Sequence, residues 1–217
     1  MIIIGAKGFA KEVLEILHRQ TEPGKLAFYD DISPDAPATL FGSFPVYRDF
    51  SQVKQHFDKI DNRFALGIGS PAARKQLSDR FIAAGGILTS TVSDRAIIGS
   101  FGVGIGAGCN ILSGATLSND VTIGVGALVY YGVTVTHDCV VGDFAELSPS
   151  VILLGRSRVG AFTQIGAGSI VLPDVKIGSN VIIGAGSLVT KDIPDNVVAY
   201  GHPAKVVRTL EPIKQPT

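Results

Sequence analysis

The chain has 217 residues, enough for one sizeable domain or two small ones. Nineteen basic residues balance nineteen acidic residues, which argues against a nucleic-acid-binding protein, because such proteins bind largely by neutralising phosphates. No apolar stretch is longer than a short strand, and no basic segment or small-residue cleavage site follows Met1. We therefore expect no membrane span and no signal peptide, and a protein of the cytoplasm.

Residues 1–90 carry the pattern of a small α/β domain with a parallel sheet. The expected elements, in chain order, are a strand at 1–4, a helix at 9–20, a strand at 25–31, a strand at 64–69, a helix at 70–84 and an extended segment at 86–92. We identify no further strand and helix that could hold the second half of a dinucleotide.

A glycine turn, Gly5-Ala6-Lys7-Gly8, joins the first strand to the first helix. Such a turn can present backbone amides to an anion, and Asp30 and Asp31 end the next strand, where carboxylates can accept ribose hydroxyl protons. The turn lacks the full dinucleotide fingerprint and the Gly-Lys-Ser/Thr of a phosphate loop. The pattern therefore favours one bound nucleotide over two, with a glycine that merely turns the chain as the alternative.

An aliphatic residue then recurs every six residues. These fifteen positions, which we call rungs, are Ile105, Ile111, Leu117, Ile123, Val129, Val135, Val141, Leu147, Leu153, Val159, Ile165, Val171, Ile177, Ile183 and Val189. The residue four places after each rung is small or β-branched. A period of six fits neither a helix nor a hairpin meander, so it indicates a β-solenoid with three hexapeptides in each coil.

Two further features follow from this register. Cys109 and Cys139 occupy the small position of the repeat, which predicts buried thiols rather than a disulfide. Ile98 and Ile105 are seven residues apart instead of six, so we expect a first, irregular coil at 91–104. The solenoid domain is therefore predicted to span 91–217.

His137 is the strongest candidate for chemistry. It lies two residues after a rung, at an outward corner, and the 18-residue coil places Asn119 below it and Gly155 above it. A neighbouring carboxylate such as Asp138 could orient the imidazole and stabilise its protonated form. The pattern favours a general base, with a solvated surface histidine as the alternative.

Three segments carry a resemblance to a known family: residues 4–13, residues 137–144 and the closing residues 201–205. With the repeats, they resemble the hexapeptide-repeat acyltransferases of the sialic acid O-acetyltransferase and nucleotide-amino-sugar N-acetyltransferase family. The resemblance implies a left-handed parallel β-helix, an exception to the usual right-handed crossover. It also implies a homotrimer with acetyl-coenzyme A sites between neighbouring subunits, and no metal.

The resemblance assigns roles to residues. His137 would be the general base, modulated by Asp138, and the acetyl-coenzyme A site would comprise Gly155, Ala167, Ala185, Pro203 and Lys205. The substrate site would comprise Gly5, Ala6, Lys7, Gly8, Asp30, Asp31, Gly69, Ser70 and Arg74. Family members often have a second histidine nine residues after the first, whereas this chain has Glu146, which we add to the substrate site.

The resemblance implies an enzyme that transfers acetyl from acetyl-coenzyme A to a sugar. The expected acceptor is the 4-amino group of a UDP- or dTDP-linked 4-amino-deoxysugar, attacked directly, with O-acetylation of sialic acid or another sugar as the alternative. A zinc lyase on this solenoid would need three imidazoles, which the four histidines do not supply in one region. A non-catalytic scaffold is the alternative of another class.

Overall fold

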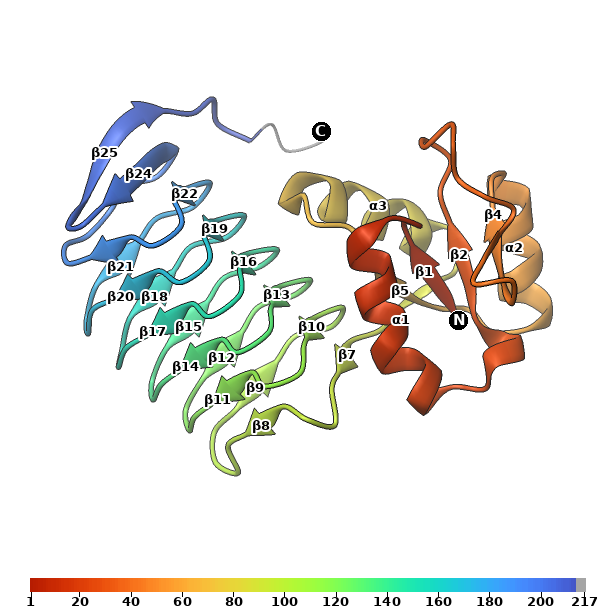
Figure 1. The fold of residues 1–217 in the computed structure, drawn as a ribbon, viewed down its shortest axis with the longest axis horizontal. Helices are drawn as coiled ribbons and strands as arrows, with labels where there is room; N and C mark the ends of the chain where they lie inside the picture. Colours follow the sequence, from red (N-terminus) through yellow and green to blue (C-terminus); the bar gives the residue numbers. More distant parts are fainter. Residues whose placement is uncertain (214–217) are drawn as a thin grey trace. The chain divides into compact units, whose positions relative to one another are not determined.

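The computed structural model describes residues 1–213. The chain divides into two compact units, Met1–Thr91 and a second unit that begins at Val92 (Figure 1). The first contains helices and a mainly parallel sheet, and the second contains short stacked strands. None of the described helices has the length and apolar character needed to cross a membrane.

The first unit is built on a six-stranded sheet in the order β3-β4-β2-β1-β5-β6. Its elements are β1 (Ile2–Ile4), α1 (Gly8–Gln20), a 3-10 turn (Pro23–Lys25), β2 (Ala27–Tyr29), β3 (Thr39–Leu40), β4 (Phe44–Tyr47), α2 (Phe50–Lys59), β5 (Arg63–Leu66), α3 (Pro71–Ala83) and β6 (Ile87–Leu88). Every pairing is parallel except that of β3 with β4. The expected α/β class of this domain is confirmed.

Burial explains why these segments form the core of the unit. All three residues of β1 are buried, and the strand pairs with β2 on one side and β5 on the other. Residues three and four apart share one side of a helix, so α1 can place Val13, Leu14 and Leu17 in one apolar cluster with Ile3 and Phe28.

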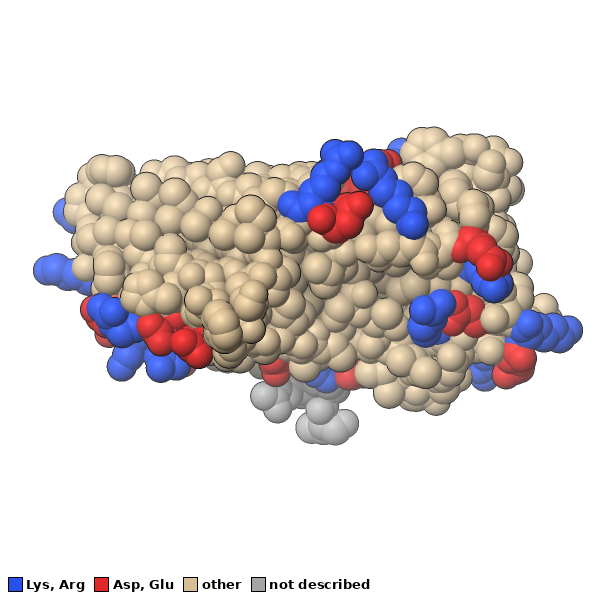
Figure 2. Space-filling view, turned by 90° about the horizontal axis from the view of Figure 1, so that it is seen from below, with Lys and Arg blue, Asp and Glu red and all other residues tan. Residues whose placement is uncertain are grey.

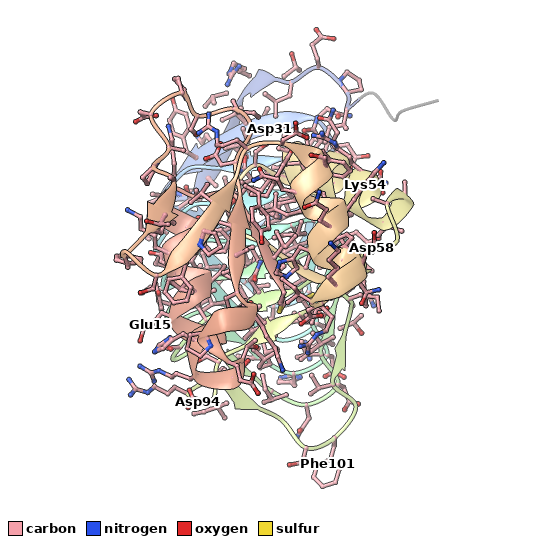
Figure 3. All side chains as sticks on the ribbon, turned by 90° about the vertical axis from the view of Figure 1, so that its right-hand side faces the viewer. Glu15, Asp31, Lys54, Asp58, Asp94 and Phe101 are labelled. Carbon is pink, nitrogen blue, oxygen red and sulfur yellow. The ribbon has the colours of Figure 1, made fainter. Side chains whose placement is uncertain are left out.

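The expectation that this unit has no further strand and helix is wrong. Strand β4 extends the sheet beyond β2, and α2 follows it. Pro45 within β4 and the mixed composition around it hide the strand, because proline is depleted in strands. The start of α2 could have been predicted from the sequence, because Asp49 and Gln52 are three residues apart and form a capping box. Lys54 and Asp58 lie on its exposed side (Figure 3).

The second unit is a parallel β-helix of three sheets, whose coils are stacked in sequence order (Figure 1). The first sheet holds β7 (Thr91–Val92), β10 (Asn110–Ile111), β13 (Leu128–Val129), β16 (Glu146–Leu147), β19 (Gln164–Ile165), β22 (Ile182–Ile183), β24 (Val197–Gly201) and β25 (Ala204–Thr209). The second holds β8 (Ile97–Ile98), β11 (Thr116–Leu117), β14 (Thr134–Val135), β17 (Ile152–Leu153), β20 (Ile170–Val171) and β23 (Leu188–Val189). The third holds β9 (Gly104–Ile105), β12 (Thr122–Ile123), β15 (Val140–Val141), β18 (Arg158–Val159) and β21 (Lys176–Ile177).

The six-residue register is confirmed. Thr134 pairs with Ile152 and Val135 with Leu153, so residues 18 apart in sequence stack in neighbouring coils. Every rung from Ile111 to Val189 is buried, as is the small or β-branched residue four places after each rung. The rungs therefore form the continuous core of the β-helix.

The details of the first coil and of the cysteines also agree with the sequence. Ile97 pairs with Thr116, a spacing of 19 residues, whereas Gly104 pairs with Thr122 at 18, so the first coil contains one extra residue. Phe101 projects from this coil, 72% exposed (Figure 3). Cys109 and Cys139 are both buried, and neither forms a disulfide.

Candidate functional site

The β-helix presents His137 at a corner. The preceding rung, Val135, is buried in the core, and the chain then turns outward before β15 begins. Asp138 takes a left-handed backbone conformation with φ of 60°. Backbone hydrogen bonds hold the turn from both sides: Asp138 donates to the Asn119 carbonyl at 3.2 Å, and Arg156 donates to the His137 carbonyl at 3.0 Å. The corner is thus fixed by its neighbours in the coils below and above.

The imidazole of His137 is held by the carboxylate of Asp138. Its Nδ1 lies 2.6 Å from Oδ2 of Asp138. A carboxylate can only accept, so this bond requires the proton on Nδ1 and leaves the Nε2 lone pair available. The side chain is 55% exposed, so Nε2 is open to a ligand. This arrangement is that of a histidine oriented to accept a proton.

Gly155 makes room for the ring. A β-carbon at this position would lie 2.6 Å from Cε1 and 2.7 Å from Nε2 of His137. Both distances are shorter than van der Waals contact, so only glycine fits above the ring in this orientation. Within residues 1–213, the Gly155 amide donates no backbone hydrogen bond, so it is a candidate donor to a ligand oxygen.

A polar groove begins at this corner and follows the next coils. Its volume is about 630 Å³, and it is lined by Asp138, Arg156, Arg158, Asp174 and Lys176. Arg156 donates two hydrogen bonds to Asp174, at 2.6 and 2.8 Å. The sequence interpretation missed this groove, although the 18-residue spacing of Arg158 and Lys176 was a signal that they stack.

The remaining residues assigned to the acetyl-coenzyme A site lie elsewhere on the β-helix. Ala167 and Ala185 are exposed at the corner that follows β19 and β22, which belong to a different sheet from β14. Pro203 lies in the tight connection between β24 and β25, and Lys205 pairs with Tyr200 in that hairpin. The structure does not bring these four residues to His137 within one chain.

Glu146 also lies apart from His137. It begins β16, in the sheet of β13 and β19, and its side chain accepts hydrogen bonds from Ser148 and Gln164, each at 3.2 Å. Within one chain it therefore belongs to a separate polar cluster.

The first unit contains a cavity of about 310 Å³ at the carboxyl ends of β1, β2 and β5. This edge of a parallel sheet is where ligands of α/β domains usually bind. The cavity is lined by Ile4, Gly5, Ala6, Lys7, Phe9, Tyr29, Asp30, Asp31, Ile32, Ser33, Gly67, Ile68, Gly69 and Leu77. It brings together six residues predicted for the substrate site, whereas Gly8, Ser70 and Arg74 are not part of its lining.

The two carboxylates of the cavity are held differently. Oδ1 of Asp30 accepts hydrogen bonds from the amides of Ile32 and Ser33, at 3.2 and 2.9 Å. Burial alone would raise the pKa of Asp30, but the bonds from Ser33 and Ile32 outweigh it and lower the pKa. Asp30 is therefore an anion that stabilises its own turn.

Asp31 is tied to an aromatic cluster. It accepts from the Tyr29 hydroxyl at 2.6 Å and from Arg80 at 3.1 Å. Burial opposes ionisation of Asp31, but the Tyr29 and Arg80 hydrogen bonds prevail and lower its pKa. Burial and the bond to Asp31 raise the pKa of Tyr29 to about 12. The carboxylate is thus charged and fixed in direction at the mouth of the cavity.

Gly5 closes the turn between β1 and α1. Its φ of +98° favours glycine, and a β-carbon there would lie 2.8 Å from the Gly67 carbonyl oxygen. Its amide donates to Tyr29 at 2.7 Å and so is not available to an anion. The first amides of α1 lack partners within the helix, so they are the donors that a ligand in the cavity could use.

The other predicted residues of this unit have structural contacts. Lys7 is exposed, with its Nζ 3.7 Å from a carboxylate oxygen of Asp35. Ser70 caps α3 by accepting from the Ala73 amide at 3.4 Å. Arg74 is fully buried and donates to the Gly69 carbonyl. Arg74 therefore positions the loop after β5 instead of facing the cavity.

Family comparisons match both units. Residues 1–81 match the PglD N-terminal domain, and residues 156–191 match the bacterial transferase hexapeptide (six repeats). A comparison with curated proteins finds no match.

Solved structures match nearly the whole chain. PerB from Caulobacter crescentus, crystallised with CoA and GDP-perosamine, is 32% identical, with a TM-score of 0.86 over 95% of this chain and 96% of that one. The chain belongs to the hexapeptide-repeat sugar acetyltransferases. A second member, the acetyltransferase domain of PglB from Neisseria gonorrhoeae in complex with acetyl coenzyme A, is 27% identical, with a TM-score of 0.84 over 95% and 98% of the two chains.

Membership in this family confirms the expected fold and enzyme class. The second unit is a left-handed parallel β-helix, and the protein is an acyltransferase, so the alternative of a non-catalytic scaffold is wrong. WeeI from Acinetobacter baumannii is 24% identical, with a TM-score of 0.77 over 95% of this chain and 98% of that one, and it has the same fold. Among the described residues, no three His, Cys, Asp or Glu side chains form a group that could hold a metal ion.

Proposed function

We propose that this protein transfers acetyl from acetyl-coenzyme A to the amino group of a nucleotide-linked amino sugar, with His137 as the general base. The observation that carries the proposal is the position of the His137 ring, with Nδ1 bonded to Asp138 and Nε2 directed to Gly155. The same corner therefore offers a proton acceptor and a backbone amide donor. PerB, which is similar over nearly its whole length, was crystallised with CoA and GDP-perosamine.

The proposed reaction is a direct attack. Nε2 of His137 accepts a proton from the sugar amine while the amine nitrogen bonds to the thioester carbonyl carbon. The Gly155 amide donates to the carbonyl oxygen, where negative charge develops. The carbon–sulfur bond then breaks, and the proton on His137 passes to the departing thiolate. Asp138 stabilises the imidazolium between these two steps. The buried Cys109 and Cys139 are not placed to form an acyl-enzyme.

The cavity of the first unit would bind the nucleotide. Asp31 is a fixed anion that can accept from ribose or base, and the amides at the start of α1 can donate to phosphate. We accordingly regard residues 1–90 as the nucleotide-sugar domain and residues 91–217 as the acetyl-coenzyme A domain. The sequence favours a UDP- or dTDP-linked 4-amino-deoxysugar, and PerB adds GDP-linked sugars to the candidates.

We further propose a cytoplasmic homotrimer with active sites between subunits. The outer face of the second sheet supports this assembly, because Ile152, Ile170 and Leu188 stack along it in register. A second copy could also bring Glu146 and the Ala167 corner to His137, which one chain does not. Light scattering coupled to size exclusion should give three times the chain mass of 22.7 kDa, and a monomer would contradict this part of the proposal.

One assay tests the activity. Acetyl-coenzyme A is incubated with UDP-, dTDP- and GDP-linked 4-amino sugars and with free sialic acid, and thiol release is followed. We expect turnover with one of the nucleotide-linked amines and a loss of at least about 100-fold in His137→Ala, since general-base catalysis contributes roughly 10² to 10⁴-fold. Turnover with sialic acid alone would establish the O-acetylation alternative instead. Full activity of His137→Ala would exclude the proposed base.

A further inference from the structure

We propose that Arg158 and Lys176 form a phosphate-binding site for coenzyme A, in the groove that begins at Asp138. This inference rests on the proposed use of acetyl-coenzyme A and specifies where its anionic end binds. Neither residue was assigned to any site from the sequence. The chemistry they would recognise is a phosphate group, either the diphosphate or the ribose phosphate of coenzyme A.

The two cations lie side by side on the outer face of the third sheet. Arg158 in β18 pairs in register with Lys176 in β21. The residues that follow them, Val159 and Ile177, are rungs buried in the core, so Arg158 and Lys176 point outward. Both are exposed and line the groove of about 630 Å³.

In residues 1–213, the side chains of Arg158 and Lys176 make no hydrogen bond or ion pair. The nearby carboxylates are already engaged: Asp174 binds Arg156, Asp138 binds His137, and Oδ1 of Asp192 accepts from the Lys176 backbone amide at 2.8 Å. Like charges on directly opposite residues of neighbouring strands repel each other. An anion bound between Arg158 and Lys176 would be attracted to both side chains and would offset their mutual repulsion.

The outward positions of the third sheet below the pair carry no charge. The surface in Figure 2 is covered mainly by uncharged residues, with lysine, arginine and acidic side chains gathered in a few mixed clusters. On the same face, the coils below carry Val140 and Thr122, which are uncharged. In the coil above, Asp192 lies beside Lys176, and its carboxylate accepts from the Lys176 backbone amide. The pair is therefore a local cationic site.

The position of the pair relative to His137 favours coenzyme A over a sugar nucleotide. Arg158 and Lys176 lie one and two coils beyond the coil that contains His137 and Val140, or ~5 and ~10 Å along the axis at the spacing of paired strands. Arg158 lies in the same coil as Gly155, where the thioester is proposed to bind, and Lys176 lies one coil beyond. In coenzyme A the pantetheine arm separates the thioester from the phosphates, so an arm that runs along the groove would bring the phosphates to these cations.

Calorimetric binding tests the assignment without an acceptor or turnover, so it remains informative even if the acceptor sugar is not the proposed one. The variants are Arg158→Gln, Lys176→Gln and the double variant, and Arg95→Gln is the matched control, an exposed arginine of the same unit outside the groove. The ligands are coenzyme A, dephospho-coenzyme A, pantetheine, UDP and GDP. Unchanged melting temperatures would show that the variants are folded.

We expect each single variant to bind coenzyme A about tenfold more weakly, and the double variant more weakly still, because a charge-assisted contact is lost. Binding of pantetheine, UDP and GDP should be unchanged, and Arg95→Gln should bind coenzyme A like the natural protein. A smaller loss for dephospho-coenzyme A would assign the site to the ribose phosphate, and an equal loss would assign it to the diphosphate. Unchanged coenzyme A binding, an equal loss for pantetheine, or a loss confined to UDP or GDP would overturn the proposal.

Discussion

The imidazole of His137 lies so close to Gly155 that a β-carbon at residue 155 would come within 2.6 Å of Cε1. Gly155 has no positive φ, so glycine is needed here for the space it leaves and not for its backbone conformation. The position of the proposed general base therefore depends on the absence of a side chain one coil above it.

Replacing Gly155 with alanine should lower activity with little effect on folding. The methyl group would displace the exposed His137 ring and break its bond to Asp138, and we expect kcat to fall about 100-fold, within the range that general-base catalysis supplies. Steady-state kinetics and thermal melting measure the two effects. Gly104→Ala is the matched control, because a β-carbon at Gly104 meets nothing within 4 Å. A Gly155→Ala enzyme with normal kcat would contradict the role of this contact.

Asp138→Asn should impair catalysis through the tautomer of His137. An asparagine amide can donate to Nδ1 and so place the ring proton on Nε2, where it blocks proton acceptance. We expect kcat to fall by about 10² to 10⁴-fold with a small change in KM. Asparagine also tolerates the left-handed backbone that Asp138 adopts, so the corner should stay folded.

The control for this prediction is Asp120→Asn, one coil below, where the backbone is also left-handed with φ of 56°. Asp120 has no contact with the ring, so its variant should keep full activity. Equal losses in the two variants would indicate that the corner, and not the tautomer, is disturbed.

Leu153→Ala should destabilise the β-helix. Leu153 is a fully buried rung, and a leucine-to-alanine change in a core costs about 2–5 kcal/mol. Its neighbour Leu154 is only partly buried, so Leu154→Ala should cost about 1 kcal/mol or less. Urea denaturation followed by circular dichroism measures the difference, and equal effects would argue against the packing described here.

The first unit should lose stability as the pH falls from about 6.5 to about 4. Burial, together with the nearby amino group of Met1, lowers the pKa of His56 to about 4 from an ordinary value of 6.5. The unfolded chain therefore binds more protons than the folded chain between these two values, so the free energy of unfolding falls with falling pH across this window. The contacts agree, since His56 bonds Tyr47 through Nδ1 and Met1 through Nε2, each at 3.1 Å.

Denaturation of the natural protein and of His56→Gln at several pH values checks this prediction. The glutamine variant does not titrate, so its stability should depend less on pH between 4 and 6.5. If the free energy of unfolding of His56→Gln depended on pH as steeply as that of the natural protein, the effect would belong to other groups, such as Asp61. Burial alone would raise the pKa of Asp61, but hydrogen bonds from Arg63 outweigh it and lower the pKa, so the contribution of Asp61 to stability is lost at still lower pH.

Much of the β-helix site follows from local repetition. Because each coil has 18 residues, the sequence already predicts that Asn119, His137 and Gly155 share a corner, and the backbone hydrogen bonds between these coils agree. The same spacing could have revealed the stacking of Arg158 on Lys176. In contrast, the sequence gives no period in the first unit, and β4 and α2 were missed there.

The sequence by itself determined the solenoid, its register and the corner that carries His137, because a repeat that buries the same two positions in every six residues repeats its own geometry. Only the tertiary structure decided which polar groups are available. It showed that Arg74 is buried against the Gly69 carbonyl, that Asp30 stabilises its own turn, and that Ala167 stands at a different corner from His137. The physical reason is that a side chain's exposure and hydrogen-bond partners depend on contacts between distant segments, which spacing along the chain does not encode.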